Sequence, residues 1–236
     1  MYKAKKAIIM AAGIGSRLRP ATLDTPKPMV RVNGVRMIDS VIKALRQNGI
    51  CDIYIVVGYL KEKFEVLTKE YDGIHLIENP HYNEYNNISS LYAAREYLGD
   101  CVILDGDQLI FNSEILNSEF EKSCYCCKWT DDETDEWLLT VENGRTTRCS
   151  TTGGSHGWQL YSVSFWTKED GERLKKHLEL EFEEKKNYQV YWDNVALLLH
   201  PDDYDIGVRQ IHDGDIVEID NYDELIQLEK NLNKLG

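Results

Sequence analysis

The stretch KAIIMAAGIGSRLRP, residues 6–20, decides the fold that this chain is expected to adopt. It begins with a short apolar run typical of a buried strand and continues directly into a glycine-rich turn. Glycine lets the backbone approach a ligand closely and turns amide groups toward it, which suits a bound phosphate. The spacing is neither that of a dinucleotide-binding fingerprint nor that of a P-loop. The stretch therefore predicts a strand followed by a phosphate-binding loop of another class.

Two cations close to this turn strengthen the phosphate interpretation. Arg17 lies within the turn, and Lys27 lies between two prolines in the segment TPKPM, residues 25–29. A guanidinium binds phosphate oxygens as a fork, and a lysine ammonium binds them as a point charge. A structural turn beside two solvated cations is the weaker explanation of this combination. We therefore expect the nucleotide to contact the following residues of the loop: Ala11, Ala12, Gly13, Gly15 and Arg17.

The rest of the first half alternates apolar strands with helices. Apolar residues recur at helical spacing in residues 37–47, and Gly49 follows as a C-terminal cap. Further helices are expected at residues 60–71 and 89–98, and strands at residues 52–57, 74–78 and 100–104. Strands that are apolar throughout and alternate with helices predict a Rossmann-like α/β fold, a mostly parallel sheet flanked by helices. Ligands of such sheets bind at the carboxyl ends of the strands.

The second half has a different character and predicts a smaller, mixed β lobe for an acceptor substrate. Strands are expected at residues 123–129, 136–141, 159–166 and 216–219, and helices at residues 168–184 and 222–235. Residues 147–157 are polar and rich in glycine, so we expect a mobile loop there. A length of 236 residues fits one domain, 1–236, with a nucleotide-binding half, 1–110, and an acceptor-binding half, 111–236.

Composition and charge exclude several classes of protein. With 40 acidic against 27 basic residues the net charge is -13, which disfavours a nucleic-acid-binding protein and suits bound metals and cationic ligands. No apolar run approaches the ~20 residues of a membrane span, so no membrane partner is expected. The apolar start reads as a first strand rather than as a signal peptide, which predicts a cytoplasmic protein. The sequence does not indicate an oligomeric state.

The six cysteines are expected to be reduced thiols. Three of them, Cys124, Cys126 and Cys127, lie close enough in sequence to suggest a zinc site, but no second pair at ligand spacing accompanies them. Alternation along a strand would point Cys124 and Cys126 to one face and Cys127 to the other. We therefore expect small core residues rather than zinc ligands.

Acidic residues follow the strand expected at residues 100–104. Asp105 and Asp107 come directly after it, and carboxylates at that end of a parallel sheet point into the ligand crevice. Magnesium prefers one or two carboxylates together with phosphate oxygens and water. The pair is therefore a candidate for nucleotide and magnesium binding, although any single acid in a chain with 40 also fits a surface charge.

The loop and cation pattern, G-x-G-x-R-x-x-P followed by P-K-P, resembles the signature of sugar-nucleotide-type nucleotidyltransferases over residues 7–32. Further segments resemble bacterial CTP:phosphocholine cytidylyltransferases, in the same order and at similar spacing. They are YNNISSLY (85–92), TDEW (134–137), SFW (164–166), YWDN (191–194) and EID (218–220). No Glu-Lys-Pro segment, common in sugar-nucleotide enzymes, occurs in the middle of the chain, which disfavours a hexose phosphate as acceptor.

The resemblance implies a magnesium-dependent enzyme that makes CDP-choline and pyrophosphate from CTP and phosphocholine. It assigns the metal to Asp107 and to an acid of the EID segment, where alternation places Glu218 and Asp220 on one face of their strand. It also places Asn87 and Ser90 beside the nucleotide base.

The implied reaction needs no nucleophile from the protein, because a phosphate oxygen of the acceptor attacks the α-phosphorus of CTP in line. Catalysis is then expected to come from positioning and charge neutralisation, with Arg17, Lys27 and Asp107 as the catalytic candidates. Arg17 would neutralise the β- and γ-phosphates, and Lys27 would reach the phosphates around the reacting centre. Asp107, with Asp220, would hold magnesium at the α-phosphate.

A trimethylammonium group is bound by aromatic faces and a nearby carboxylate, because it has no N–H group to donate. Trp137, Tyr191 and Asp193 supply such groups, whereas Trp192 would point the opposite way from an extended segment. Asp135 stands where the phosphocholine enzymes are expected to carry an uncharged amide, and a carboxylate there suits a primary ammonium. A 2-aminoethylphosphonate or phosphoethanolamine acceptor therefore stays open.

A non-catalytic nucleotide sensor with the same fold is the alternative from another functional class. The combination of Arg17, Lys27 and Asp107 argues against it, because a protein that only binds a nucleotide has little need for the acid. Metal-dependent release of pyrophosphate separates the two hypotheses.

Overall fold

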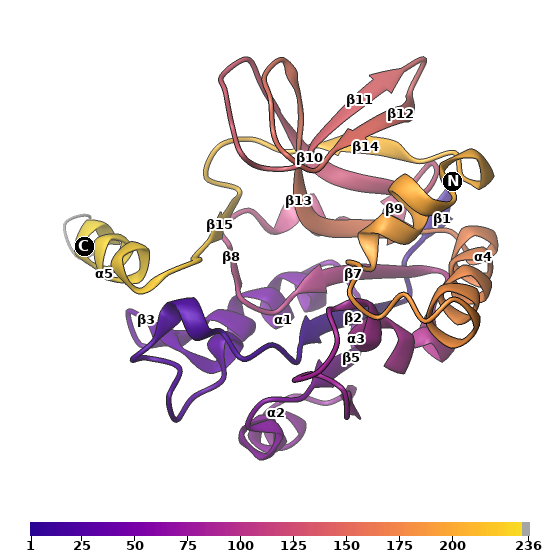
Figure 1. Cartoon of the computed structure of the whole chain (residues 1–236). Coiled ribbons are helices and arrows are strands. Elements are labelled where there is room, and N and C mark those ends of the chain that lie inside the picture. Colours follow the sequence, from indigo (N-terminus) through magenta and orange to yellow (C-terminus); the bar gives the residue numbers. More distant parts are fainter. Residues whose placement is uncertain (233–236) are drawn as a thin grey trace.

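A computed structural model describes residues 1–232, and a nine-stranded sheet runs through its centre (Figure 1). The apolar strands of the first half form its parallel part: β2 (Lys6–Ala11), β5 (Asp52–Val57), β6 (Ile74–Glu78) and β7 (Cys101–Asp105). β2 pairs in parallel with β5 on one side and with β7 on the other, and β6 extends beyond β5. The strand order therefore reverses between β2 and β7, and the loops after these two strands border the crevice where such sheets bind ligands.

Helices cover both faces of this sheet, as predicted. Apolar residues of α1 (Met37–Gln47) and α2 (Glu65–Glu70) pack in one core, and those of α3 (Ile88–Ala93) and α4 (Lys168–Glu179) pack in the core of the opposite face. The bounds of α1 are as predicted, and Gly49 follows with φ 75°, in the left-handed region that glycine adopts readily.

Two expected helices of the first half are divided, and the helix predicted at residues 168–184 consists of α4 followed by a π-helical turn, Leu180–Glu184. The one predicted at residues 60–71 consists of a 3-10 turn, Lys61–Phe64, followed by α2. The one predicted at residues 89–98 consists of α3 and a 3-10 turn, Arg95–Tyr97. In each case the apolar periodicity identified the segment but not the change of helix type, since both types place residues three or four apart on one face.

The second half continues the same sheet with antiparallel strands. The long strand β13 (Gly157–Trp166) pairs with β7 and carries β10 (Cys124–Thr130) and β11 (Leu138–Glu142). The outer strands are β12 (Arg145–Ser150), beside β11, and β14 (Gly207–Gln210), parallel to β10. The mixed β region predicted for this half is therefore present, but it extends the central sheet.

The prediction of a loop over residues 147–157 was wrong for its first part. β12 forms a hairpin with β11, and only residues 151–156 lie between β12 and β13. The turn is made by Asn143 (φ 52°) and Gly144 (φ 74°), both in the left-handed region. Asn-Gly is the residue pair that favours a tight hairpin turn, so the signal was present in the sequence.

Cysteine burial agrees with the alternation predicted along β10. Cys124 and Cys126 belong to the core on one face of the sheet, and Cys127 belongs to the core on the other. All six cysteines of the chain are free thiols. Burial raises the pKa of Cys124 to about 11, as expected of an inert core residue.

The last part of the chain brings a second short sheet against the crevice. Here β15 (Ile216–Glu218) pairs antiparallel with β8 (Gln108–Ile110), directly after β7. The final helix α5 spans Tyr222–Leu232, and residues 233–235, where the helix was predicted to continue, lie outside the described residues. Along residues 1–232 no helix is both long enough and apolar enough to cross a membrane.

Candidate active site

The loop that follows β2 is held in place by its neighbours. Gly15 adopts φ 64°, and a Cβ at this position would lie 2.9 Å from Lys27 Cβ. Thr22 Oγ1 donates a hydrogen bond of 2.8 Å to the Gly15 carbonyl. The next residues form a 3-10 turn, Ser16–Leu18, which the fully buried Leu18 anchors in the core. Glycine is therefore required where the loop passes Lys27.

Lys27 is the central cation of the site. Its Nζ lies 2.7 Å from Asp107 Oδ2 and 3.7 Å from Asp220 Oδ1, and its side chain is only 12% exposed. Burial lowers the pKa of Lys27, but the charges of both carboxylates and the hydrogen bond to Asp107 outweigh burial and raise this pKa above its usual value. Arg17 is 72% exposed and contacts Asp220 Oδ1 at 3.0 Å. Two charged cations thus meet two acids from distant segments.

A hollow beside the loop, here named the phosphate pocket, has a volume of about 260 Å³. It is lined by Met10, Ala11, Gly13, Gly15, Ser16, Arg17, Lys27, Pro28, Asp107 and Asp220. Ala12, which was predicted to contact the nucleotide, does not line it. The side chains of Ala11 and Ala12 both pack in cores, on opposite faces of the sheet, and the Ala12 carbonyl accepts a hydrogen bond from the Tyr59 N–H.

A second hollow, here named the acidic cavity, adjoins the phosphate pocket and has a volume of about 330 Å³. It is lined by Arg17, Lys27, Asn87, Asp105, Asp107, Glu136, Trp137, Leu160, Ser162, Tyr191, Asp193, Glu218 and Asp220. Arg17, Lys27, Asp107 and Asp220 line both hollows and therefore form the wall between them. A molecule in one hollow thus lies beside a molecule in the other.

Pairing of β15 with β8 brings Glu218 to this wall. Glu218 lies opposite Gln108 in the strand register, and Gln108 Nε2 donates a hydrogen bond of 2.6 Å to Glu218 Oε1. Asp107 and Asp220 both reach the Lys27 ammonium, so their carboxylates face a common point. Hard oxygen donors grouped in this way fit a divalent cation of the magnesium type. The residues predicted to hold the metal are therefore gathered at one place.

Three acids of the cavity, Asp105, Asp193 and Glu218, have raised pKa values. Glu218 is exposed to solvent through the hollow, but desolvation by the surrounding protein and the charges of Asp107 and Asp220 raise its pKa to about 7. Burial raises the pKa of Asp193 to about 7. The pKa of Asp105 also lies well above its usual value, because of burial and then the charges of Asp107, Glu218 and Asp193. A cavity that raises several carboxyl pKa values has a surplus of negative charge, which a bound cation would neutralise.

Aromatic and acidic groups meet at the far side of the cavity. The rings of Trp137 and Tyr191 pack edge to face with centroids 5.6 Å apart, and Tyr191 is half exposed. Asp193 Oδ1 is buried and makes no hydrogen bond of normal geometry with any described residue. The pKa of Asp193 is moderated by the nearby Tyr125 hydroxyl, whose oxygen is likewise without such a bond. The Asp193 carboxyl therefore lies beside the buried Tyr125 hydroxyl and also lines the cavity, where a ligand can reach it.

Trp192 lies away from the cavity, as predicted, but for a different reason. Asp193 begins a helical segment that continues into a π-helical turn, Val195–Leu199, so the segment is not an extended strand. Trp192 packs in the core against Tyr125 and Trp166. Trp192 therefore lies apart from the cavity residues Tyr191 and Asp193 because it packs in the core, and not because the side chains of a strand alternate.

Asp135 does not line the cavity, whereas its neighbour Glu136 does. Thr134 pairs through its backbone with Gly154, and its Oγ1 accepts a hydrogen bond of 3.1 Å from the Glu136 N–H. This local turn interrupts strand alternation and leaves the Asp135 side chain exposed. The sequence did not indicate that Glu136 lines the cavity, because the turn depends on the contact with the distant Gly154.

The two residues predicted to contact the base have different positions. Asn87 lines the acidic cavity, and its Oδ1 accepts a hydrogen bond of 2.9 Å from the Trp192 N–H. Ser90 is buried and lines neither hollow, because its hydroxyl accepts a hydrogen bond of 3.0 Å from Asn79 Nδ2. Ser90 therefore supports the helix that carries this segment.

Comparisons with known proteins agree with this geometry. The chain matches the MobA-like NTP transferase domain over residues 7–151. It is 35% identical to the choline-phosphate cytidylyltransferase of Streptococcus pneumoniae, over 96% of this chain and 98% of that protein. It is 36% identical to the 2-aminoethylphosphonate cytidylyltransferase of Lancefieldella rimae, over 93% and 89% of the two chains.

A solved structure extends the similarity to the whole fold. The CTP:phosphocholine cytidylyltransferase from Streptococcus pneumoniae superposes with a TM-score of 0.89 at 35% identity, and the match covers 96% of this chain and 98% of that chain. Enzymes of this type typically use a divalent metal, which agrees with the grouped carboxylates. The α/β fold and the enzyme class predicted from the sequence are thereby confirmed. The chain belongs to the nucleotidyltransferases that carry a MobA-like NTP transferase domain.

Proposed function

We propose that this nucleotidyltransferase transfers the CMP group of CTP to phosphocholine, releasing pyrophosphate and forming CDP-choline. The buried Asp193 carboxyl, which lines the acidic cavity together with the Trp137–Tyr191 pair, is the observation that carries the acceptor assignment. The phosphocholine-specific relative at 35% identity over 96% of the chain supports the same choice. A carboxylate and two aromatic rings suit a quaternary ammonium, which is attracted to ring faces and negative charge.

In this proposal the phosphate pocket holds the triphosphate of CTP. Backbone groups of Ala11, Gly13 and Gly15 line it and can approach phosphate oxygens closely. The exposed Arg17 neutralises the phosphates that leave as pyrophosphate. Lys27, fixed between two carboxylates, lies at the wall where the two substrates meet.

Mg²⁺ is the divalent metal proposed for the site, held by Asp107 and Asp220 with Glu218 as a third donor. The fit rests on three carboxylates that face one cavity, two of which reach the same ammonium. When bound, the metal supplies positive charge to the α-phosphate and orients the phosphate of the acceptor. Lys27 would share Asp107 and Asp220 with the metal, and its ammonium would also contact phosphate oxygens.

The chain contributes positioning rather than a covalent intermediate. A phosphate oxygen of the acceptor forms the new bond to the α-phosphorus, and the bond to the β-phosphate bridging oxygen breaks as pyrophosphate leaves. The ammonium end is held by Asp193 and the ring pair, so the acceptor phosphate is directed toward the wall of Lys27 and Asp107. Correct alignment of the two substrates can supply several kcal/mol of the barrier reduction. We propose that Asn87 contacts the base and that Ser90 acts indirectly by supporting it.

A second candidate acceptor is 2-aminoethylphosphonate, or the related phosphoethanolamine. The relative named for the phosphonate is 36% identical over 93% of the chain. In addition, Glu136 joins Asp193 and Glu218 around the cavity, and several carboxylates suit a primary ammonium that donates hydrogen bonds. The number of acids favours this acceptor, whereas the ring pair favours phosphocholine.

Pyrophosphate release from CTP with Mg²⁺ tests both assignments. Phosphocholine, phosphoethanolamine, 2-aminoethylphosphonate and glucose 1-phosphate are compared at equal concentration, and UTP replaces CTP in a parallel series. We expect the highest kcat/KM with CTP and phosphocholine. A preference for the phosphonate would transfer the assignment to the second candidate. Turnover with glucose 1-phosphate alone would refute both.

A further inference from the structure

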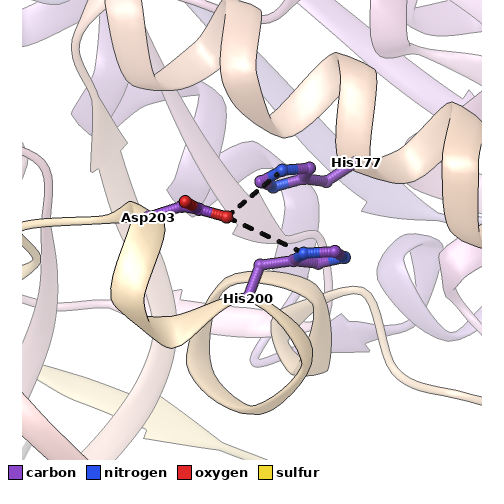
Figure 2. A group of neighbouring side chains, drawn as sticks. All are labelled: His177, His200 and Asp203. Atoms are coloured by element: carbon purple, nitrogen blue, oxygen red, sulfur yellow. Dashed lines mark ion pairs between the residues drawn. The ribbon is translucent and has the colours of Figure 1, made fainter.

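A cluster of metal-ligating side chains lies outside the two hollows described above. His177 is near the end of α4, His200 follows the π-helical turn Val195–Leu199, and Asp203 ends the next 3-10 turn (Figure 2). One potential ligand atom from each residue lies within 4.8 Å of the other two. None of the three residues lines the phosphate pocket or the acidic cavity. The cluster therefore needs an explanation apart from the transfer reaction.

The two imidazoles face the same carboxylate oxygen. Asp203 Oδ2 lies 3.6 Å from His177 Nε2 and 3.9 Å from His200 Nδ1. The rings stack with centroids 3.8 Å apart, and Figure 2 shows the carboxylate at the edge of the stack. Both histidines are mostly buried, whereas the Asp203 side chain is 56% exposed. The arrangement is thus mostly enclosed on the protein side and open on the solvent side.

The remaining ring nitrogen of each histidine lies within hydrogen-bond distance of an oxygen atom. His200 Nε2 lies 2.7 Å from Oε1 of Glu181, whose side chain is completely buried. Glu181 also accepts hydrogen bonds from Lys185 and Asn187. A carboxylate that accepts from these neighbours also accepts from His200, so a neutral His200 carries its proton on Nε2. Its Nδ1 lone pair then points toward Asp203.

His177 is held in the complementary way. Its Nδ1 lies 2.8 Å from Tyr204 Oη, which leaves Nε2 directed at Asp203. Histidines that ligate metals commonly have their second nitrogen bonded to a carboxylate or another oxygen in this manner. Both rings of the cluster meet that condition.

We propose that His177, His200 and Asp203 bind a divalent transition-metal ion, with zinc as the representative case. Two imidazoles and a carboxylate suit zinc, nickel or copper, whereas magnesium prefers the oxygen donors of the acidic cavity. Tetrahedral ligands at roughly 2.0–2.2 Å from zinc lie about 3.3–3.5 Å apart, close to the present separations. The rings open from their stack on binding, because the metal lies in the plane of each ligating imidazole. Solvent at Asp203 completes the coordination.

A metal at this site would stabilise the segment that carries the cavity residues Tyr191 and Asp193. Glu181 also accepts hydrogen bonds from Lys185 and Asn187, which precede Tyr191 in the chain. His200 ends the helical segment that begins at Asp193. A metal that fixes His200 would therefore stabilise this segment at its end. We expect bound zinc to raise the Tm of the whole protein, since a ligand that binds only the folded state stabilises it.

Zinc binding to the untagged, EDTA-treated chain, measured by competition with a chromogenic chelator, tests the proposal. His200→Ala and Asp203→Asn are each expected to bind one ion fewer than the wild type and to lose the zinc-dependent rise in Tm. His212→Ala, an exposed histidine outside the cluster, serves as the matched control and should bind as the wild type does. Asp203→Asn changes an exposed side chain, so its fold is expected to be retained even if His200→Ala unfolds.

A spectroscopic readout locates the ion independently of stoichiometry. In ¹⁵N-detected histidine spectra, zinc should shift Nε2 of His177 and Nδ1 of His200 and leave the ring of His212 unchanged. Equal zinc binding by the wild type and Asp203→Asn, together with unshifted nitrogens of His177 and His200, would overturn the proposal. Neither readout depends on turnover, so the result is independent of the proposed acceptor.

Discussion

The phosphate pocket and the acidic cavity share a wall, yet they are opposite in chemistry. On the pocket side, backbone groups of a glycine loop and the cations Arg17 and Lys27 face the space. On the cavity side, Glu136, Asp193 and an edge-to-face ring pair do so. One side suits a polyanion and the other suits a cation. The contrast suggests that two oppositely charged substrate ends are held apart while their phosphates meet at the shared wall.

The two hollows also differ in how the chain builds them. Most residues of the phosphate pocket come from positions 10–28, and only Asp107 and Asp220 come from elsewhere. The acidic cavity collects residues from many segments between positions 17 and 220. Substitutions on the two sides should therefore affect different kinetic parameters, and the following changes test that separation.

Lys27→Ala is expected to have the largest effect. Removing a preorganised charge at the reacting centre lowers kcat by about 10²–10³-fold, with a smaller change in KM for CTP. Steady-state pyrophosphate release measures both parameters. Lys122→Ala, which removes an exposed ion pair with Asp205, is the matched control. A wild-type kcat in Lys27→Ala would contradict the catalytic role proposed for Lys27 at the wall between the two hollows.

Asp193→Asn should act on the acceptor side alone. Because the loss of one partner of a buried charge pair costs roughly 2–5 kcal/mol, kcat/KM for phosphocholine should fall about 30-fold or more. The KM for CTP should not change. Thermal unfolding at about pH 8 provides the control for folding. Burial raises the pKa of Asp193, so its charged form destabilises the folded protein at this pH. The Asn variant should therefore have the higher Tm. An unchanged acceptor KM would contradict the assignment.

The pH dependence of acceptor binding sharpens the same comparison. The pKa of Asp193 is raised to about 7, so its carboxyl is charged above this pH and neutral below it. A cationic acceptor needs the charged form, and its KM should rise by up to about tenfold per pH unit as the pH falls below 7. Asp193→Asn should lose this part of the profile and retain the titration of the acceptor's own phosphate. Identical profiles in the two proteins would exclude Asp193 as the titrating group.

Glu136→Gln and Asp135→Asn should have the smallest effects, and only the first should be measurable. Glu136 lines the cavity although it is exposed, whereas Asp135 points to solvent. An exposed ion pair is worth up to ~1 kcal/mol, so Glu136→Gln should raise KM for a primary-amine acceptor about two- to fivefold. Comparing phosphoethanolamine with phosphocholine measures the difference. A larger effect of Asp135→Asn would reverse the placement of the two acids.

Much of the fold could be predicted where local periodicity and packing agree. The predicted bounds of α1, β5 and β6 are those of the structure, because each segment buries one regular apolar face or run. The hairpin of β11 and β12 was not predicted, although Asn143 and Gly144 indicate a tight turn. The polar composition of the second strand favoured the prediction of a loop. Helix type changes within residues 60–71 left no mark on the apolar pattern.

The sequence by itself determined the phosphate loop, because the glycines, Arg17 and Lys27 all lie within residues 13–27. Their spacing in the chain is enough to place them around one ligand. Only the tertiary structure decided which acids share a cavity, that Glu136 rather than Asp135 lines it, and that His177, His200 and Asp203 meet. It also decided the raised pKa of Asp193. Burial and the distance between charges depend on segments far apart in the chain, and no local pattern of residues encodes them.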